Sequence, residues 1–254
     1  MTTPPSSDRG TMLITGGSRG IGAATSRLAA ERGWAVAIVY RDRSADADAL
    51  VAEIVAAGGR AAAIRADVAD EAQVLAAFEA ADRLGPLTAL VNNAGITGGN
   101  ARVESVRVEQ IDQAFAINVR GAFLCAREAV RRMSTKHGGR GGAIVNVGSG
   151  ASQTGSPNAW VHYAATKGAM DSMTIGLAKE VAAEGIRVNA VRPGIIDTEI
   201  HAARPPGQLD QMARAVPMGR IGAPEEIARS IVWLADERES PYVTATLLDA
   251  RGGL

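Results

Sequence analysis

The feature of this sequence that most constrains its fold is an alternation of short apolar runs with longer amphipathic stretches. Apolar runs of strand length cover residues 12–15, 34–40, 60–66, 87–92, 143–147, 186–191 and 242–248. Stretches with helical periodicity cover residues 20–32, 45–57, 70–84, 104–132, 160–183 and 223–236. Strands that alternate with helices predict a parallel sheet, and continuous apolar runs predict a sheet buried on both sides. We therefore expect an α/β fold: a single-domain, doubly wound (Rossmann-type) parallel sheet of about seven strands with helices on both faces.

The remainder of the chain predicts one domain. Residues 1–9 are polar and predict a flexible tail, whereas residues 10–254 carry the alternation without a linker or a repeat. Residues 195–216 contain two prolines and predict a short lid over a substrate. Hydrophobic residues make up 46% of the chain and charged residues 21%, which excludes disorder over most of its length.

Charge and composition exclude several classes of function. Lys plus Arg and Asp plus Glu both number 27, so the net charge is zero and no nucleic-acid surface is expected. No apolar run approaches the roughly 18 residues of a membrane span, and the first residues do not read as a signal peptide. We expect a cytoplasmic protein without membrane contact. Cys125 is the only cysteine and the three histidines show no ligand spacing, so no disulfide and no metal site are expected.

A glycine-rich turn follows the first predicted strand and opens the first predicted helix. It carries Gly16, Ser18, Arg19, Gly20, Ile21 and Gly22. Glycines allow a tight turn and close approach of a pyrophosphate to the amides of a helix N-terminus. The spacing is Gly-x-x-x-Gly-x-Gly, which differs from the common dinucleotide pattern, and an ordinary strand–helix turn is the alternative.

A tyrosine, a lysine and a serine carry the candidate chemistry. Tyr163 and Lys167 are four residues apart and share one face of a predicted helix. An ammonium beside a phenol lowers the pKa of the phenol, which can then act as a general acid or base. Ser149 ends a predicted strand at the ligand-binding edge of the sheet, where its hydroxyl can hold a substrate oxygen. The alternatives are a packed tyrosine with a surface lysine, and Ser152 or Ser156 in place of Ser149.

These stretches together resemble the short-chain dehydrogenase/reductase family over residues 10–254. The matches, in the family's order, are residues 15–22, Asp67, Val68, residues 92–95, Asn118, Ser149, Tyr163, Lys167, Pro193, Gly194, Thr198, Asp249, Gly252 and Gly253. Two features depart from the family. Ser149 and Tyr163 are 14 residues apart, one more than is frequent, and Ala245 stands where glycine is frequent.

The resemblance implies a role for each matching residue. Tyr163 would be the acid/base, Lys167 would bind the nicotinamide ribose, Ser149 would polarise the substrate oxygen, and Asn118 would hold a proton-relay water. The cofactor would contact Gly16, Ser18, Arg19, Gly20, Ile21, Gly22, Tyr40, Arg41, Asp67, Val68, Asn92, Ala94, Gly95, Tyr163, Lys167, Pro193, Gly194, Ile196 and Thr198. Within that set, Asp67 would meet the adenine, and Ile196 and Thr198 would fix the carboxamide.

Counting along the family pattern also predicts the cofactor. Tyr40 occupies the strand-end position where an acid would bind the ribose hydroxyls of NAD, and Arg41 follows it. Arg41 and Arg19 could hold a 2′-phosphate through charge-assisted bonds, which favours NADP(H). A shift of one residue would make Asp42 the ribose acceptor and favour NAD(H), and a solvated loop is the third interpretation.

The leading hypothesis is an oxidoreductase that transfers a hydride between NADP(H) and a carbonyl or secondary alcohol. The alternatives are an NAD-dependent sugar or alcohol dehydrogenase of the same fold, and a catalytically inactive nucleotide-sensing protein. The partner would be a small-molecule substrate, and its specificity would reside in residues 153–160 and 195–216. The resemblance further implies a homo-oligomer, commonly a tetramer.

Overall fold

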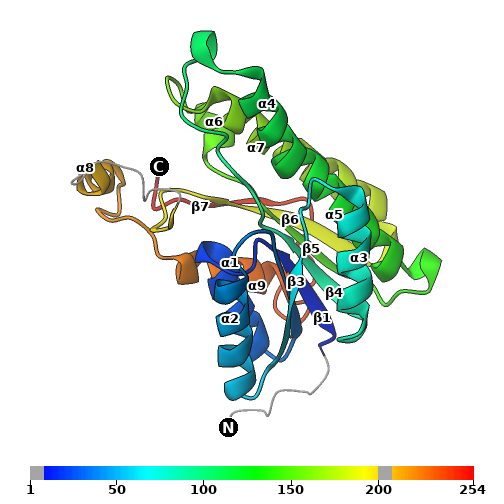
Figure 1. The fold of residues 1–254 in the computed structure, drawn as a ribbon. Coiled ribbons are helices and arrows are strands. Elements are labelled where there is room, and N and C mark those ends of the chain that lie inside the picture. The colour runs from blue at the N-terminus through cyan, green and yellow to red at the C-terminus, as the bar shows by residue number, and fades with distance from the viewer. Residues whose placement is uncertain (1–8, 200–207) are drawn as a thin grey trace.

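The computed structural model describes residues 9–199 and 208–254, and it contains a seven-stranded sheet in which every neighbouring pair is parallel (Figure 1). The strand order is β3-β2-β1-β4-β5-β6-β7. The strands are β1 (Thr11–Thr15), β2 (Ala35–Tyr40), β3 (Arg60–Arg65), β4 (Leu87–Asn92), β5 (Gly142–Val147), β6 (Ile186–Pro193) and β7 (Leu247–Ala250). The predicted seven-stranded, doubly wound sheet is confirmed.

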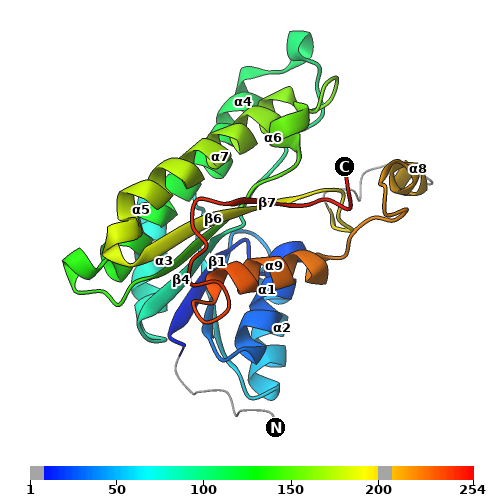
Figure 2. The ribbon, with the colours of Figure 1, turned by 180° about the vertical axis from the view of Figure 1, so that it is seen from behind.

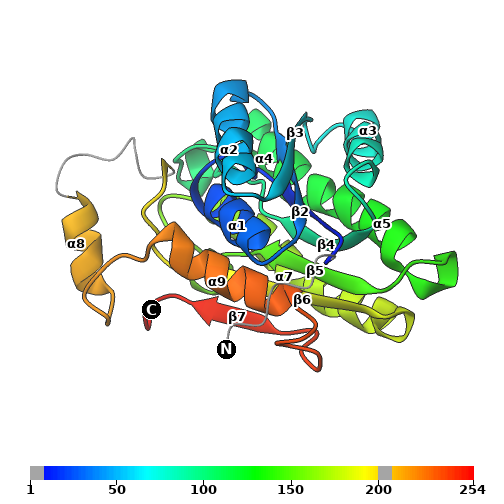
Figure 3. The same ribbon diagram turned by 90° about the horizontal axis from the view of Figure 1, so that it is seen from below.

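Helices cover both faces of the sheet. They are α1 (Gly20–Glu31), α2 (Ser44–Ala56), α3 (Glu71–Asp82), α4 (Val108–Phe115), α5 (Ala122–Met133), α6 (Ala151–Thr154), α7 (Val161–Val181), α8 (Gln208–Ala215) and α9 (Pro224–Ala235). Figures 2 and 3 show α1, α2 and α9 on one face and α3, α5 and α7 on the other. Successive side chains of β1 point to opposite faces of the sheet and belong to two different hydrophobic cores. Leu13 packs with α3, α5 and α7, whereas Met12 and Ile14 pack with α1, α2 and α9. Such alternation explains why the strands are apolar throughout.

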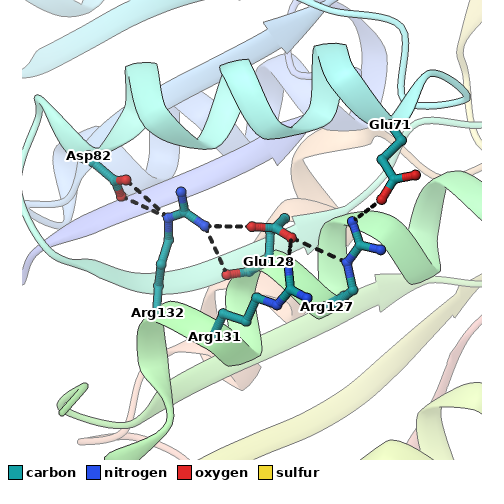
Figure 4. A network of polar contacts seen from close by, with 6 residues as sticks. All are labelled: Glu71, Asp82, Arg127, Glu128, Arg131 and Arg132. Carbon is teal, nitrogen blue, oxygen red and sulfur yellow. Dashed lines mark hydrogen bonds and ion pairs between the residues drawn. The ribbon is translucent and has the colours of Figure 1, made fainter. Parts of the chain in front are cut away.

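A cluster of charges joins α3 to α5 (Figure 4). The side chain of Glu128 is 4% exposed and accepts hydrogen bonds from Arg127 at 3.2 Å, Arg131 at 2.8 Å and Arg132 at 2.9 Å. Arg132 also reaches Asp82 of α3 at 3.0 Å. Burial by itself raises the pKa of the Glu128 carboxyl, but the three guanidinium groups outweigh it and hold that pKa below its usual value. The cluster therefore fixes α5 against α3 with a buried carboxylate that stays ionised.

Three predicted elements differ from the structure. The last strand begins at Leu247 instead of residue 242, because the amide of Ala245, at φ +60°, turns to the Val188 carbonyl at 2.8 Å. The stretch 104–132 is broken into a 3-10 turn η1 (Val103–Ser105), α4, a π-helix η2 (Ala116–Gly121) and α5. A helix, α8, lies within the stretch 195–216, for which the sequence predicted a lid but no helix. The tail expected at residues 1–9 lies outside the described residues except for Arg9, and residues 200–207 of the expected lid also lie outside them.

The strand order reverses direction at β1, which has β2 on one side and β4 on the other. In open parallel sheets, ligands bind at the carboxyl ends of the strands beside such a reversal. β1 ends at Thr15, β4 at Asn92, β5 at Val147 and β6 at Pro193. The candidate residues of the sequence follow these ends, so the topology gathers them at one edge.

Candidate active site

The glycine-rich turn after β1 is shaped for close approach of a ligand. Gly16 and Gly20 have φ values of +61° and +50°. A Cβ on Gly22 would lie 2.1 Å from the Gly16 carbonyl oxygen, so a side chain there is excluded. The turn is braced by Asn93, whose side-chain amide donates to the Thr15 and Gly16 carbonyls at 2.9 and 3.0 Å.

The N-terminus of α1 lies beside this turn and fits an anionic cofactor group. No side chain of the described residues caps the first turn of α1, and that turn contains no acidic residue. Free amides at a helix N-terminus bind phosphates well. The glycine-rich turn, in which a Cβ on Gly22 would collide with the Gly16 carbonyl, thus fits the pyrophosphate of a nicotinamide dinucleotide at Gly20, Ile21 and Gly22.

Ser149, Tyr163 and Lys167 meet in one cavity of about 320 Å³ next to the turn. Ser149 follows β5 and its hydroxyl oxygen accepts a hydrogen bond from the Ala151 amide at 3.1 Å. Tyr163 and Lys167 lie on α7, with the Lys167 Nζ 5.7 Å from the centre of the Tyr163 ring. Lys167 donates to the Val147 carbonyl at 2.7 Å, which ties α7 to the end of β5.

The titration behaviour of the site is set by burial. Burial lowers the pKa of Lys167 to about 8, although the carboxylate of Asp171 opposes this shift. Burial raises the pKa of the Tyr163 phenol above its usual value, and a hydrogen bond with Ser149 acts in the opposite direction. The predicted lowering of the pKa of Tyr163 is therefore not found in the structure, because loss of solvent disfavours the phenolate more than Ser149 favours it. The Lys167 ammonium nevertheless lies close enough to the Tyr163 ring to favour a phenolate there.

Asn118 lies in the π-helix η2 and braces the site from behind. Its side-chain amide donates to the Ile96 carbonyl at 2.8 Å and to the Thr166 hydroxyl at 2.9 Å, and its oxygen accepts from the Ile96 amide at 2.9 Å. A Cβ on Gly95 would lie 3.3 Å from the Asn118 oxygen and 3.6 Å from the Lys167 Nζ. Asn118 thus fixes the backbone next to Lys167, and its relay of protons stays a prediction.

The structure brings many of the predicted cofactor residues to the cavity and leaves others outside it. Those that line it are Ile21, Gly95, Tyr163, Lys167, Pro193, Gly194, Ile196 and Thr198. Asn92 is buried and bonds to Asn146 of β5 at 3.0 Å, so it braces the sheet. Asp67 accepts from the Ala69 amide at 2.9 Å at the end of β3. Asn93 also lines the cavity, a role that was not predicted from the sequence, although Asn93 lies in the matching stretch 92–95.

The basic residues near the end of β2 are all paired with carboxylates. Arg41 lies 2.7 Å from Asp42 and 3.8 Å from Asp67. Arg19 lies 2.8 Å from Glu199, and Arg43 contacts the same carboxylate at 3.0 and 3.1 Å. Sequence reasoning missed the pairing of Arg43 with Glu199, because 156 residues separate them.

Two further observations concern classes of function that were not expected. No group of three or more His, Cys, Asp or Glu residues within the described ranges could hold a metal ion. None of the helices in the described part of the chain is long and apolar enough to cross a bilayer.

Comparison with known proteins defines the class. A family model described as "Enoyl-(Acyl carrier protein) reductase" matches residues 16–254. The chain is 51% identical to "Uncharacterized oxidoreductase YgfF" of Escherichia coli K12, with 95% of this chain and 98% of that protein aligned. It is 40% identical to a cis-4-hydroxycyclohexanecarboxylate dehydrogenase of Sinomonas cyclohexanicum, with 95% and 94% aligned.

Solved structures agree with this class. A blue fluorescent protein from a metagenomic library in complex with NADPH superposes with a TM-score of 0.89 at 37% identity, covering 97% of this chain and 98% of that one. A 3-oxoacyl-[acyl-carrier protein] reductase from Brucella melitensis with bound NAD gives 0.87 at 35% identity, covering 100% and 96%. The chain is thus an NAD(P)-dependent oxidoreductase of CH–OH and C=O groups with a Rossmann-type fold. It belongs to the short-chain dehydrogenase/reductase family.

Proposed function

We propose that this enzyme transfers a hydride between NADP(H) and a carbonyl or secondary alcohol, with Tyr163 as the acid/base. The observation that carries the proposal is the convergence of Ser149, Tyr163 and Lys167 on one cavity beside the glycine-rich turn. A bound nicotinamide cofactor supplies or accepts the hydride. The inactive, nucleotide-sensing alternative loses support, since the side chains that the acid/base chemistry needs are present and line one cavity.

Each residue has a distinct task in the proposed reduction. Ser149 donates a hydrogen bond to the substrate carbonyl oxygen and holds it near the phenol of Tyr163. Tyr163 gives its proton to that oxygen as negative charge develops there. Lys167 lies near enough to stabilise the resulting phenolate through its ammonium. In the oxidative direction the same phenolate accepts the proton of the alcohol.

The preference for NADP(H) is supported by the basic residues after β2. Arg19 and Arg43 hold a carboxylate between them, and a 2′-phosphate has the same charge sign and similar oxygen geometry. Arg41 contributes a third positive charge nearby. The NAD(H) alternative requires Asp42 to accept ribose hydroxyls, and Asp42 is bound by Arg41 at 2.7 Å. We therefore keep NADP(H) as the proposed cofactor.

We further propose one catalytic domain over residues 10–254 and a homotetramer. Large apolar side chains are exposed on α5 and α7, among them Phe123 at 52% and Ile175 at 37%. Trp233 of α9 is 36% exposed and Tyr242 is fully exposed, which offers a second apolar surface. Burial of these side chains between subunits is favourable. Sedimentation equilibrium tests the proposed tetramer, and a monomer in solution would refute it. A cytoplasmic location stays a prediction.

The test of the function is an assay of carbonyl reduction and alcohol oxidation with NADPH/NADP and with NADH/NAD. Absorbance at the reduced-nicotinamide band follows turnover directly. We expect turnover with a panel of ketones, and a higher kcat/KM with NADPH than with NADH. A chain that binds cofactor and yet transfers no hydride to or from any substrate in the panel would support the nucleotide-sensing alternative.

A further inference from the structure

The cavity beside Ser149 is lined by a positively charged side chain, Arg251, that has no role in the proposed hydride transfer. Arg251, just after β7, lines this cavity together with Lys167. Among the described residues that line it, these two are the only charged side chains, and none is acidic. Because Lys167 acts through Tyr163, the charge of Arg251 is left for another group.

Two glycines hold Arg251 next to the serine. A Cβ on Gly150 would lie 2.7 Å from the Arg251 Cδ and 3.4 Å from its Nη1, and a Cβ on Gly194 would lie 2.8 Å from the Arg251 Cα. Gly150 directly follows Ser149, so the guanidinium lies at the end of the cavity where the substrate oxygen is held. The glycine-rich turn follows β1, which is separated from β7 by β4, β5 and β6. Arg251 is therefore remote from the phosphates of a dinucleotide.

The carboxylates around Arg251 do not neutralise the buried charges. Asp249 lies 3.1 Å from the Arg251 Nη2, but it is shared with Arg192, whose Nε lies 2.9 Å away. Arg192 also reaches Asp171 at 3.4 Å, and Asp171 faces Lys167. Among these side chains, three cations thus share two carboxylates, which leaves one positive side-chain charge in excess. The Arg251 side chain is 14% exposed, and its Nε is buried without a hydrogen-bond partner among the described residues.

We propose that Arg251 binds a carboxylate of the substrate, so that the enzyme acts on oxo acids or hydroxy acids. This inference rests on the proposed function. A guanidinium fork matches a carboxylate in shape and charge, and the excess positive charge favours an anion in this cavity. Ile195, Met212 and Trp160 provide apolar walls for a carbon skeleton between the carboxylate and the reacting carbonyl.

The first test measures binding without turnover. 4-Oxocyclohexanecarboxylate and its methyl ester are titrated calorimetrically into the protein with NADP⁺, a mixture in which both components are oxidised and no hydride can move. We expect the wild type to bind the acid at least about tenfold more tightly than the ester, since one charge-assisted contact is sufficient for that ratio. The ratio should fall to about one in Arg251→Gln and stay partly in Arg251→Lys. Equal binding of acid and ester by the wild type would overturn the proposal.

A matched control removes a charge elsewhere. Arg140 is exposed and precedes β5, at the opposite edge of the sheet from Ser149. Arg140→Gln should keep the wild-type preference for the acid over the ester. If Arg140→Gln and Arg251→Gln lose this preference equally, the effect comes from net charge alone and the proposal is overturned. If circular dichroism shows that Arg251→Gln does not fold, the wild-type ratio and Arg251→Lys decide. In that case, equal binding of acid and ester by the wild type refutes the proposal, and so does an acid preference in Arg251→Lys as large as that of the wild type.

Reduction of the same two compounds by NADPH separates this inference from the proposed function. If the ester is reduced as efficiently as the acid, the reductase function stands and the role of Arg251 fails. If the acid binds tenfold more tightly but neither compound nor any other ketone is reduced, Arg251 binds carboxylates and the proposed function fails.

Discussion

The contact of Arg19 and Arg43 with Glu199 predicts how cofactor selectivity responds to mutation. In the proposed complex a 2′-phosphate replaces the Glu199 carboxylate between the two guanidinium groups. Arg43 makes two contacts with that carboxylate and Arg19 makes one. Their side chains are 52% and 53% exposed, so solvent screens each contact. A charge-assisted bond contributes about 1.5–3 kcal/mol when shielded but about 1 kcal/mol at the surface, and the dianionic phosphate strengthens it.

We therefore expect Arg43→Ala to weaken NADPH binding by about 1.4 kcal/mol, which is tenfold in Kd. NADH offers a neutral hydroxyl at that position, so its Kd should change less than about twofold. Glu199→Gln removes the carboxylate that competes with the phosphate and should tighten NADPH binding, with NADH unaffected. Isothermal titration of both cofactors measures these changes.

The control for this experiment is Arg83→Ala, which removes an exposed arginine after the end of α3. It should leave both Kd values unchanged. Arg41→Ala is the informative comparison, because Arg41 already has two carboxylate neighbours and its charge is partly cancelled. An equal loss of NADPH and NADH affinity in Arg43→Ala would refute the phosphate site. Tighter binding of NADH than NADPH by the wild type, abolished in Asp42→Ala, would instead favour the NAD(H) alternative.

Three further predictions concern Tyr163, Lys167 and Glu128. Tyr163→Phe should lower turnover by about 10²-fold or more while cofactor affinity in calorimetry stays within about twofold, and wild-type turnover would exclude the acid/base role. Lys167→Met should abolish turnover yet stabilise the fold. A pKa lowered from 10.5 to about 8 corresponds to about 3 kcal/mol of stability lost below pH 8, against about 1–2 kcal/mol for the lost bond to Val147. Urea unfolding at pH 7 should show the gain, whereas the wild type should gain stability from this group as pH rises from 8 toward 10.5. Glu128→Gln should lower the free energy of unfolding by about 2 kcal/mol and Tm by about 4–8 °C. Because the folded pKa of Glu128 is depressed, this deficit should be present above its unfolded pKa and shrink as pH falls through the folded pKa; a deficit independent of pH would contradict the ion-pair explanation.

Features that depend on local chemistry could be predicted from the sequence. The apolar runs located six of the seven strands, because a doubly covered sheet demands apolar residues on both sides. The glycine-rich turn was found because Gly16 and Gly20 have backbone angles that favour glycine. Tyr163 and Lys167 share a helix face by spacing alone. The last strand was misplaced because Thr244 and Ala245 have strand-like neighbours but bond to β6 through a turn.

Features that depend on contacts between distant segments could not be predicted in the same way. Helical periodicity cannot indicate that residues 116–121 wind into a π-helix, although this turn carries Asn118 beside Ile96. The sequence also contains no indication that Asp249 and Arg192 are paired; the parallel register of β6 and β7 brings them together. The same register extends a line of alternating charges from Lys167 to Arg251. Since Asp171 both raises the pKa of Lys167 and contacts Arg192, the residue that tunes the proposed acid/base pair is linked by ion pairs to the residue proposed to bind the substrate. A substrate carboxylate paired with Arg251 would leave Asp249 to interact more strongly with Arg192. Arg192 would then hold Asp171 less strongly, and Asp171 would favour the charged form of Lys167 more, so substrate charge and the protonation of Lys167 are coupled through four side chains.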